Sequence, residues 1–243
     1  MQNFVLNLTN ENVTLTAYLP DYSPEMPYLD KRSAVLVIPG GGYYMCSDRE
    51  AEPVAFGFLG SGFAAFILRY SLKENSAFPR PLDDAREALK IIREHAEEWR
   101  IDPQKIAAIG FSAGGHLTAA LSTMSDERPN AQILGYPCIL EKIGKILAEP
   151  IPGVDTEVDE KTPPAFIFAS SEDDCVPIIN SLEYAKALDK YKIPFEMHIF
   201  SQGWHGFSRA DDTVYGKDEE VEYNKDCNIW FDLCVRWLKK IFK

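Results

Sequence analysis

Residues 105–124 of the chain have the sequence KIAAIGFSAGGHLTAALSTM, in which the motif GFSAG at 110–114 separates two apolar patterns. Residues 105–111 have the pattern of a strand, and residues 117–124 continue a helix. The glycines on both sides of Ser112 permit the tight, strained turn that lifts a serine hydroxyl out of a sheet. A G-x-S-x-G motif between a strand and a helix is the setting of a nucleophilic serine, so the sequence predicts that role for Ser112.

Strand and helix patterns alternate along the rest of the chain. Strands are expected at residues 13–20, 34–39, 64–70, 131–138, 165–171 and 195–200, and helices at 81–99, 176–192 and 228–242. This alternation predicts an α/β fold with a mostly parallel central sheet and helices on both faces. Without repeats or a linker, the chain is expected to form a single domain over residues 1–243, with no separate cap domain. Residues 141–164 are either an irregular excursion that borders the substrate site or a plain surface loop.

A nucleophilic serine needs a base. His205 lies in the loop SQGWHGF, residues 201–207, which follows the last predicted strand and lets an imidazole reach the serine. The other histidines, His95, His116 and His198, lie within helix or strand patterns that favour a surface or structural position. His205 is therefore the predicted base.

The base in turn needs an acid to orient it, and in this kind of fold the acid lies between the serine and the histidine along the chain. The loop SEDDCVP, residues 171–177, ends a predicted strand and contains three carboxylates. Asp173 and Asp174 compete for the role, and Glu172 is a weaker candidate. The residue pattern alone leaves the choice between the two aspartates open.

The tetrahedral intermediate of acyl transfer needs hydrogen-bond donors for its oxyanion. The segment PGGGY, residues 39–43, follows a strand pattern, and consecutive glycines let backbone N–H groups converge on a small anion. The segment is not a phosphate-binding loop, because no Gly-Lys-Ser or Gly-Lys-Thr follows it, and a simple turn is the remaining alternative. The amides of Gly41, Gly42 and Ala113 are the predicted donors.

Six segments together resemble the α/β-hydrolase esterases of the acetyl-esterase and acetylxylan-esterase-like group, which is related to the hormone-sensitive-lipase and dienelactone-hydrolase branches. They are PGGGY (39–43), ILRYSL (67–72), FPRPLDDAREAL (78–89), IAAIGFSAGGHLTAAL (106–121), SSEDDCVP (170–177) and HIFSQGWHGF (198–207). The resemblance implies the α/β-hydrolase fold, Asp173 as the triad acid, and small acylated carbohydrates as the substrate class. The chain departs from the group at Pro39, where many relatives have histidine.

The composition narrows the possible partners. The formal net charge is −12 and the basic residues form no long run, so nucleic acid is not an expected partner. No apolar run reaches the roughly 20 residues of a membrane helix, and the start of the chain lacks a secretory signal, which predicts a cytoplasmic protein. Five scattered cysteines without a CxxC pair offer no zinc site, and the expected chemistry needs no metal or cofactor. The oligomeric state is left open, a homo-oligomer included.

These features predict a serine carboxylester hydrolase that removes short acyl groups, acetyl above all, from small carbohydrate or polyol esters. Tyr43, Tyr44 and Trp204 flank the predicted site, where they either contact the substrate or pack within the loops. Two alternatives remain: an amidase, formamidase or peptidase with the same triad, and a non-catalytic binding protein on a hydrolase scaffold.

Overall fold

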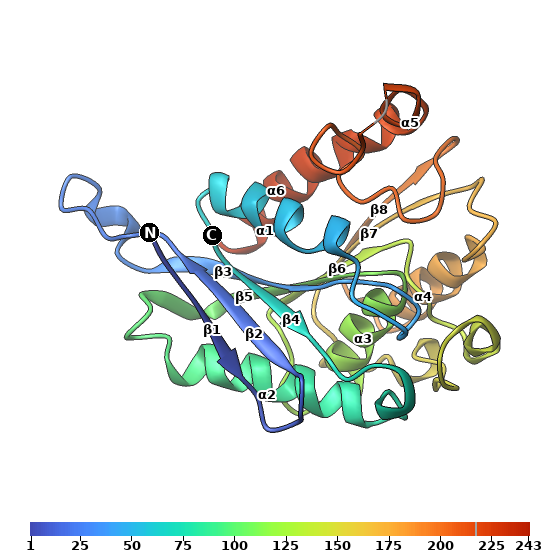
Figure 1. Cartoon of the computed structure of the whole chain (residues 1–243), viewed down its shortest axis with the longest axis horizontal. Coiled ribbons are helices and arrows are strands. Elements are labelled where there is room, and N and C mark those ends of the chain that lie inside the picture. The colour runs from blue at the N-terminus through green and yellow to red at the C-terminus, as the bar shows by residue number, and fades with distance from the viewer. Residues whose placement is uncertain (217) are drawn as a thin grey trace.

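One eight-stranded sheet runs through the computed structural model, which describes residues 1–216 and 218–243 (Figure 1). The strands lie in the order β1-β2-β4-β3-β5-β6-β7-β8. β1 pairs antiparallel with β2, and β2 with β4, whereas the other neighbours are parallel. The strands are β1 (Gln2–Asn7), β2 (Thr14–Leu19), β3 (Arg32–Ile38), β4 (Ala64–Arg69), β5 (Ile101–Phe111), β6 (Ala131–Gly135), β7 (Ala165–Ser170) and β8 (Phe195–Phe200).

Helices cover both faces of this sheet (Figure 1). α1 and α6 lie on one face, and α2, α3 and α4 lie on the other. The helices are α1 (Glu52–Gly60), α2 (Arg80–Glu94), α3 (Ser112–Thr123), α4 (Ile179–Lys190), α5 (Asp218–Asn224) and α6 (Trp230–Ile241). The predicted mostly parallel sheet with helices on both faces is confirmed, and no separate cap domain covers it within the described ranges.

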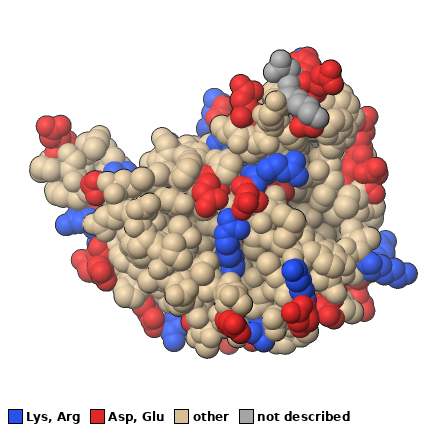
Figure 2. Space-filling model, viewed as in Figure 1, with Lys and Arg blue, Asp and Glu red and all other residues tan. Residues whose placement is uncertain are grey.

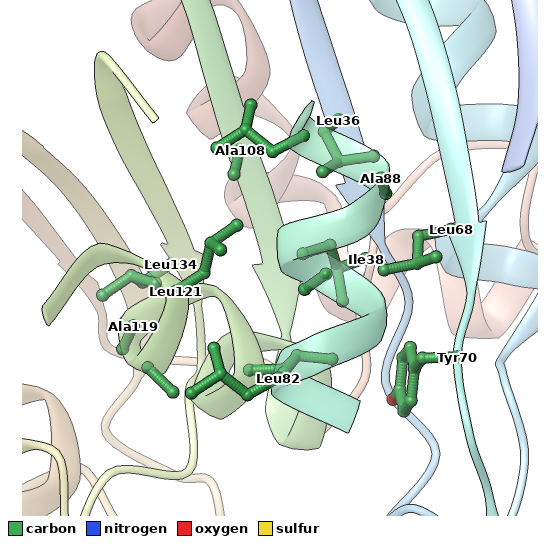
Figure 3. Packing of buried hydrophobic residues seen from close by; sticks show 14 of the residues in the cluster. Leu36, Ile38, Leu68, Tyr70, Leu82, Ala88, Ala108, Ala119, Leu121 and Leu134 are labelled. Carbon is green, nitrogen blue, oxygen red and sulfur yellow. The ribbon is translucent and has the colours of Figure 1, made fainter. Parts of the chain in front are cut away.

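Side chains that alternate along β3 build two cores, one on each face of the sheet. Leu36 and Ile38 pack on the side of α2 and α3 (Figure 3). Val35 and Val37 point the other way, into the cluster formed with α1 and α6. Because both faces are covered, β3 is apolar without interruption from Ala34 to Ile38, as is typical of a central parallel strand.

The differences from the predicted elements lie where the sequence pattern is weak. The sequence does not predict β1, an edge strand with mostly exposed side chains, or α1, whose two glycines lower its helix propensity. It does not predict α5 either. The helix expected at 81–99 ends at Glu94, because the chain then turns through Arg100, at φ 54°, to enter β5.

Residues 141–164 form an irregular segment with two short 3₁₀ helices, η4 (Glu141–Ile146) and η5 (Asp155–Glu157). The segment is tied to the body of the protein near both of its ends. The N–H of Ala148 donates to Gly42 O at 2.9 Å, and the Asp159 carboxylate pairs with Arg128. The first of these contacts places the segment beside the glycine-rich loop that follows β3.

None of the helices in the described part of the chain combines the length and the apolar character needed to cross a membrane. On the face shown in Figure 2, acidic and basic side chains are interspersed, and no continuous basic patch is visible there. The expectation that nucleic acid is not a partner is based on the net charge of the whole chain, and it stays a prediction.

Candidate active site

Ser112 stands at the turn between β5 and α3. Its φ of 52° lies in the left-handed region, which is strained for a residue with a side chain. The turn closes tightly because its glycines leave room for neighbouring carbonyls. A Cβ on Gly110 would lie 2.1 Å from Gly114 O, and a Cβ on Gly114 would lie 2.2 Å from Ile38 O. The GFSAG motif is therefore dictated by the backbone that raises Ser112.

Three side chains from distant parts of the sequence form one hydrogen-bonded chain. His205 Nε2 lies 2.9 Å from Ser112 Oγ, and His205 Nδ1 lies 2.6 Å from Asp173 Oδ2. Asp173 Oδ1 accepts the N–H groups of Cys175 at 3.0 Å and Val176 at 2.8 Å. A carboxylate with both oxygens occupied holds the imidazole in one orientation. Its Nδ1–H then faces the acid, and Nε2 is free to accept the serine proton.

The two competing carboxylates of the same loop do not reach the imidazole. Asp174 is exposed and makes no hydrogen bond within the described residues. Glu172 accepts the hydroxyl of Tyr223 at 2.7 Å. The structure thus brings Asp173, and neither Glu172 nor Asp174, against His205.

The glycine-rich loop after β3 borders Ser112 with free backbone donors. The carbonyl of Gly41 accepts the N–H groups of Tyr44 and Met45, whereas the amides of Gly41 and Gly42 have no partner among the described residues. A Cβ on Gly41, at φ +125°, would lie 2.3 Å from Met45 O, so this close turn requires glycine. The amide of Ala113 lies in the first turn of α3, where N–H groups lack intrahelical partners. The three predicted oxyanion donors therefore lie close to Ser112 in the chain fold.

Two other titratable groups near this turn are kept neutral by burial. Cys138 Sγ lies 4.0 Å from Ser112 Oγ, and burial raises the pKa of Cys138 to about 12. Burial also lowers the pKa of His116 to about 4, and its ring bridges Tyr43 Oη at 2.8 Å and Pro152 O at 3.0 Å. Neither group competes with Ser112 as a nucleophile or with His205 as a base.

A cavity of about 350 Å³ opens over Ser112 and His205. Tyr44 and Met45 contribute exposed side chains to it, and Ile146 and Leu147 give it an apolar wall. The remaining lining residues are Gly41, Gly42, Ser47, Arg49, Glu50, Cys175 and Gly206. Because Ile146 and Leu147 belong to residues 141–164, this segment borders the candidate site, which decides between the two interpretations of the sequence.

Known proteins match this chain over almost its whole length. Residues 21–141 match the BD-FAE family, and residues 150–228 match the prolyl oligopeptidase family. The structure of MGS-M1, an α/β hydrolase enzyme from a Medee basin deep-sea metagenome library, is similar with a TM-score of 0.93 and 45% identity, covering 99% of this chain and 98% of that one. The acetyl ester-xyloside bifunctional hydrolase from Caldicellulosiruptor lactoaceticus is 34% identical, with a TM-score of 0.81, covering 94% of this chain and 88% of that one. The acetylxylan esterase of Xylanibacter ruminicola is 32% identical in an alignment of 228 positions that covers 85% of this chain and 46% of that protein.

The chain belongs to the α/β-hydrolase family, in its acetyl-esterase-like group. The resemblance inferred from the six sequence segments is thereby confirmed. The chain spans less than half the length of the curated relatives that it matches over most of its own length. Similarity alone therefore does not transfer the activities of those longer proteins to this α/β-hydrolase.

The three aromatic residues expected at the site differ in their positions. Tyr44 lines the cavity, and its contact with the substrate stays a prediction. The prediction that Tyr43 contacts the substrate is wrong, because its ring is buried in the core and its hydroxyl is bonded to His116. Trp204 does not line this cavity; it stacks on Tyr223 with ring centroids 4.6 Å apart. A role for Trp204 in substrate binding stays a prediction.

Sequence reasoning missed Glu50, a buried carboxylate that lines the cavity of the α/β-hydrolase. Glu50 Oε2 accepts the N–H of Gly40 at 2.8 Å, and Glu50 Oε1 accepts the hydroxyl of Tyr136 at 2.7 Å. Its neighbours Asp48 and Arg49 are exposed, and glutamate is seldom buried, so no local pattern marks this position.

Proposed function

We propose that this α/β-hydrolase is a serine carboxylester hydrolase that removes short acyl groups, acetyl above all, from a carbohydrate or similar polyol. The observation that carries the proposal is the hydrogen-bonded chain from Ser112 through His205 to Asp173. This chain opens into a cavity bordered by the amides of the glycine loop. Its reactive serine, base, acid and anion donors are the parts that acyl transfer requires.

Each group has a defined task in the proposed reaction. Ser112 Oγ attacks the ester carbonyl while His205 Nε2 takes the serine proton, and Asp173 stabilises the imidazolium that forms. The amides of Gly41, Gly42 and Ala113 donate to the oxyanion; loss of one such donor in a serine protease costs about 3 kcal/mol. His205 returns the proton to the leaving alcohol, and water then hydrolyses the acyl-enzyme by the same steps with His205 as the base.

The cavity favours a short acyl group. Ile146 and Leu147 offer a small apolar wall, and the described residues include no cap domain that would enclose a longer chain. Each buried methylene contributes about 0.8 kcal/mol to binding. Methylenes that extend beyond the wall into water gain none of this, so lengthening the acyl chain does not improve the substrate.

The alcohol half of the proposed substrate is inferred from a side chain at the rim of the cavity and from the names of two similar proteins. Tyr44 presents an exposed ring beside the cavity, which suits stacking on the flat face of a sugar. The names of two similar proteins point the same way: one is an acetylxylan esterase, and the other is an acetyl ester-xyloside bifunctional hydrolase. An acetylated pyranoside is accordingly the proposed substrate class.

The decisive experiment measures kcat/KM for p-nitrophenyl esters of increasing acyl length and for acetylated xylosides and glucosides. We expect the acetyl or propionyl ester to be the best of the series and acetate to be released from at least one acetylated sugar. An optimum at eight carbons or beyond, with no acetate released from any sugar, contradicts the substrate assignment while leaving the esterase chemistry in place.

Amide or peptide hydrolysis is a second candidate, because residues 150–228 match the prolyl oligopeptidase family. The same serine, histidine and aspartate serve both reactions, but an amine is a poorer leaving group than an alcohol. The comparison of p-nitroacetanilide with p-nitrophenyl acetate separates the two, since both release an acetyl group. We expect turnover of the ester alone, and a kcat/KM for the anilide equal to that for the ester would favour the amidase.

A further inference from the structure

Glu50 joins two loops of the active site that are far apart in the sequence. It ends the short 3₁₀ helix η2 (Asp48–Glu50), and only 3% of its surface is exposed. One oxygen accepts the amide of Gly40, the first residue of the glycine loop, and the other accepts the hydroxyl of Tyr136, which follows β6. The contact with the loop is close, because a Cβ on Gly40 would lie 2.8 Å from Glu50 Oε2 and 3.0 Å from Ser112 Cβ.

Tyr136 extends this connection to the loop that carries the base. Its hydroxyl accepts the N–H of Ser208 at 3.0 Å, three residues beyond His205. Its ring packs edge-on against the imidazole of His205, with centroids 5.1 Å apart. Glu50 itself also reaches this loop, since a Cβ on Gly206 would lie 4.0 Å from Glu50 Oε1.

The hydrogen-bond pattern matches an ionised carboxylate. Both oxygens of Glu50 accept, and neither faces an acceptor that would require a proton. Burial is the largest influence on the pKa of Glu50 and raises it, and the hydrogen bonds from Tyr136 and Gly40 and the electrostatic influence of His205 and Arg49 offset only part of that rise. The titratable or charged groups that interact with Glu50 are Cys46, Arg49, Tyr70, Tyr136, His205 and Tyr215.

We propose that Glu50 is a positioning residue of the active site with two effects on the reaction. It fixes the glycine loop and the His205 loop relative to Ser112, and its buried negative charge favours the imidazolium that forms when His205 takes the serine proton. Asp173 stabilises the imidazolium through its hydrogen bond with Nδ1, and Glu50 adds a second negative charge that does not contact the ring. The inference rests on the proposed esterase function and concerns the same site.

Glu50→Gln tests the charge at nearly constant shape. The amide oxygen is able to accept from Gly40, and the amide nitrogen is able to donate to the Tyr136 hydroxyl. We expect kcat for p-nitrophenyl acetate to fall about tenfold to hundredfold, because the imidazolium loses a nearby negative charge, while KM changes less than about threefold. With the negative charge removed, the imidazolium is less favoured, so the acidic limb of the kcat/KM profile moves to lower pH.

Asp84→Asn is the matched control. Asp84 is another fully buried carboxylate, on α2, whose oxygens accept the Ser71 N–H at 2.8 Å and the Asn10 side chain at 2.6 Å, and it does not line the cavity. This variant should lower the melting temperature without moving the pH profile. A Glu50→Gln enzyme with the kcat and the acidic limb of the wild type, whatever its melting temperature, would overturn the proposal.

Tyr136→Phe provides the test if Glu50→Gln does not fold. It removes the hydroxyl that links Glu50 to the His205 loop and leaves the Glu50 side chain in place, so kcat should fall while KM stays unchanged. An unchanged kcat, or a change in KM alone, would overturn the proposal. If the wild type hydrolyses esters, either of these two results contradicts the role of Glu50 but not the esterase function. A wild type that hydrolyses no ester contradicts both the role of Glu50 and the esterase function.

Discussion

The two sides of the candidate active site are built in different ways. On the reacting side, Ser112 and Asp173 are 8% and 7% exposed, and every polar atom of the Ser112–His205–Asp173 chain has a partner. On the rim, the side chains of Tyr44 and Met45 are more than half exposed. Buried hydrogen bonds thus fix the atoms that do the chemistry, whereas the exposed rim is free to differ without disturbing them. Substitutions on the reacting side should therefore abolish turnover, and those on the rim should only change binding.

Ser112→Ala should give the largest effect, because it removes the nucleophile and leaves the fold intact. Loss of the serine of a comparable triad lowers kcat about a millionfold. The loss of kcat is measured with esterase assays on p-nitrophenyl acetate. Circular dichroism and thermal denaturation establish that the variant is folded. A folded variant within about tenfold of the wild type would show that Ser112 is not the nucleophile.

Asp173→Asn should give the next largest effect, with Asp174→Asn as its matched control on the same loop. Asparagine keeps the shape but favours the wrong imidazole tautomer, and the equivalent change in a serine protease lowers kcat about ten-thousandfold. The exposed Asp174 has no contact with His205, so its variant should retain nearly full activity. Equal losses in the two variants would contradict the assignment of Asp173 as the orienting acid.

Tyr44→Ala probes the rim, and Trp204→Ala is compared with it as the aromatic residue that lies outside the cavity. The Tyr44 hydroxyl donates to Leu147 O at 3.2 Å, which holds the ring beside the apolar wall. Loss of a stacking contact of about 1 kcal/mol should raise KM for an acetylated xyloside roughly fivefold, with kcat nearly unchanged. Initial-rate kinetics on that substrate test the pair, and a larger effect from Trp204→Ala would place the sugar on the Trp204–Tyr223 stack instead.

Asp159→Asn should give the smallest effect, on the stability of the segment that carries Ile146 and Leu147. The hydrogen bond from Arg128 lowers the pKa of Asp159 from 3.8 to about 2. A lowered pKa means that the pair stabilises the fold above pH 3.8 and that this contribution is lost as the pH falls toward 2. Because Asp159 is partly exposed, we expect a loss of about 1 kcal/mol or less, equivalent to at most roughly 4 °C in Tm. Thermal denaturation should show a smaller difference from the wild type at pH 3 than at pH 7, and an equal difference at both would rule out this ion pair as the cause.

The sequence predicts the parts of the site whose residue types are dictated locally. Gly110 and Gly114 are needed because a Cβ at either position would collide with a backbone carbonyl, so the turn at Ser112 is visible as a motif. Adjacent tyrosines show the limit of this reasoning. The backbone turns at Tyr43, at φ 63°, so that its ring enters the core while the ring of Tyr44 faces the cavity. Two adjacent residues of the same type thus have different surroundings.

For a related reason, the sequence does not predict the role of Glu50 and leaves open whether residues 141–164 border the site. The partners of Glu50 are Gly40 and Tyr136, and Tyr136 lies 86 positions away along the chain. Its burial is therefore a property of the assembled fold and not of the residues around it. The segment 141–164 likewise has no regular periodicity, so its place beside the cavity follows from tertiary contacts such as that of Ala148 with Gly42.

The central claim is that His205 activates Ser112 as a nucleophile. The most direct measurement is labelling with a fluorophosphonate probe, followed by peptide mass spectrometry of the wild type and of a His205→Gln variant. The account predicts a single phosphonylated residue, Ser112, in the wild type and greatly slowed labelling in the variant. No labelling of the wild type, or labelling of a different residue while esters are still hydrolysed, would contradict it.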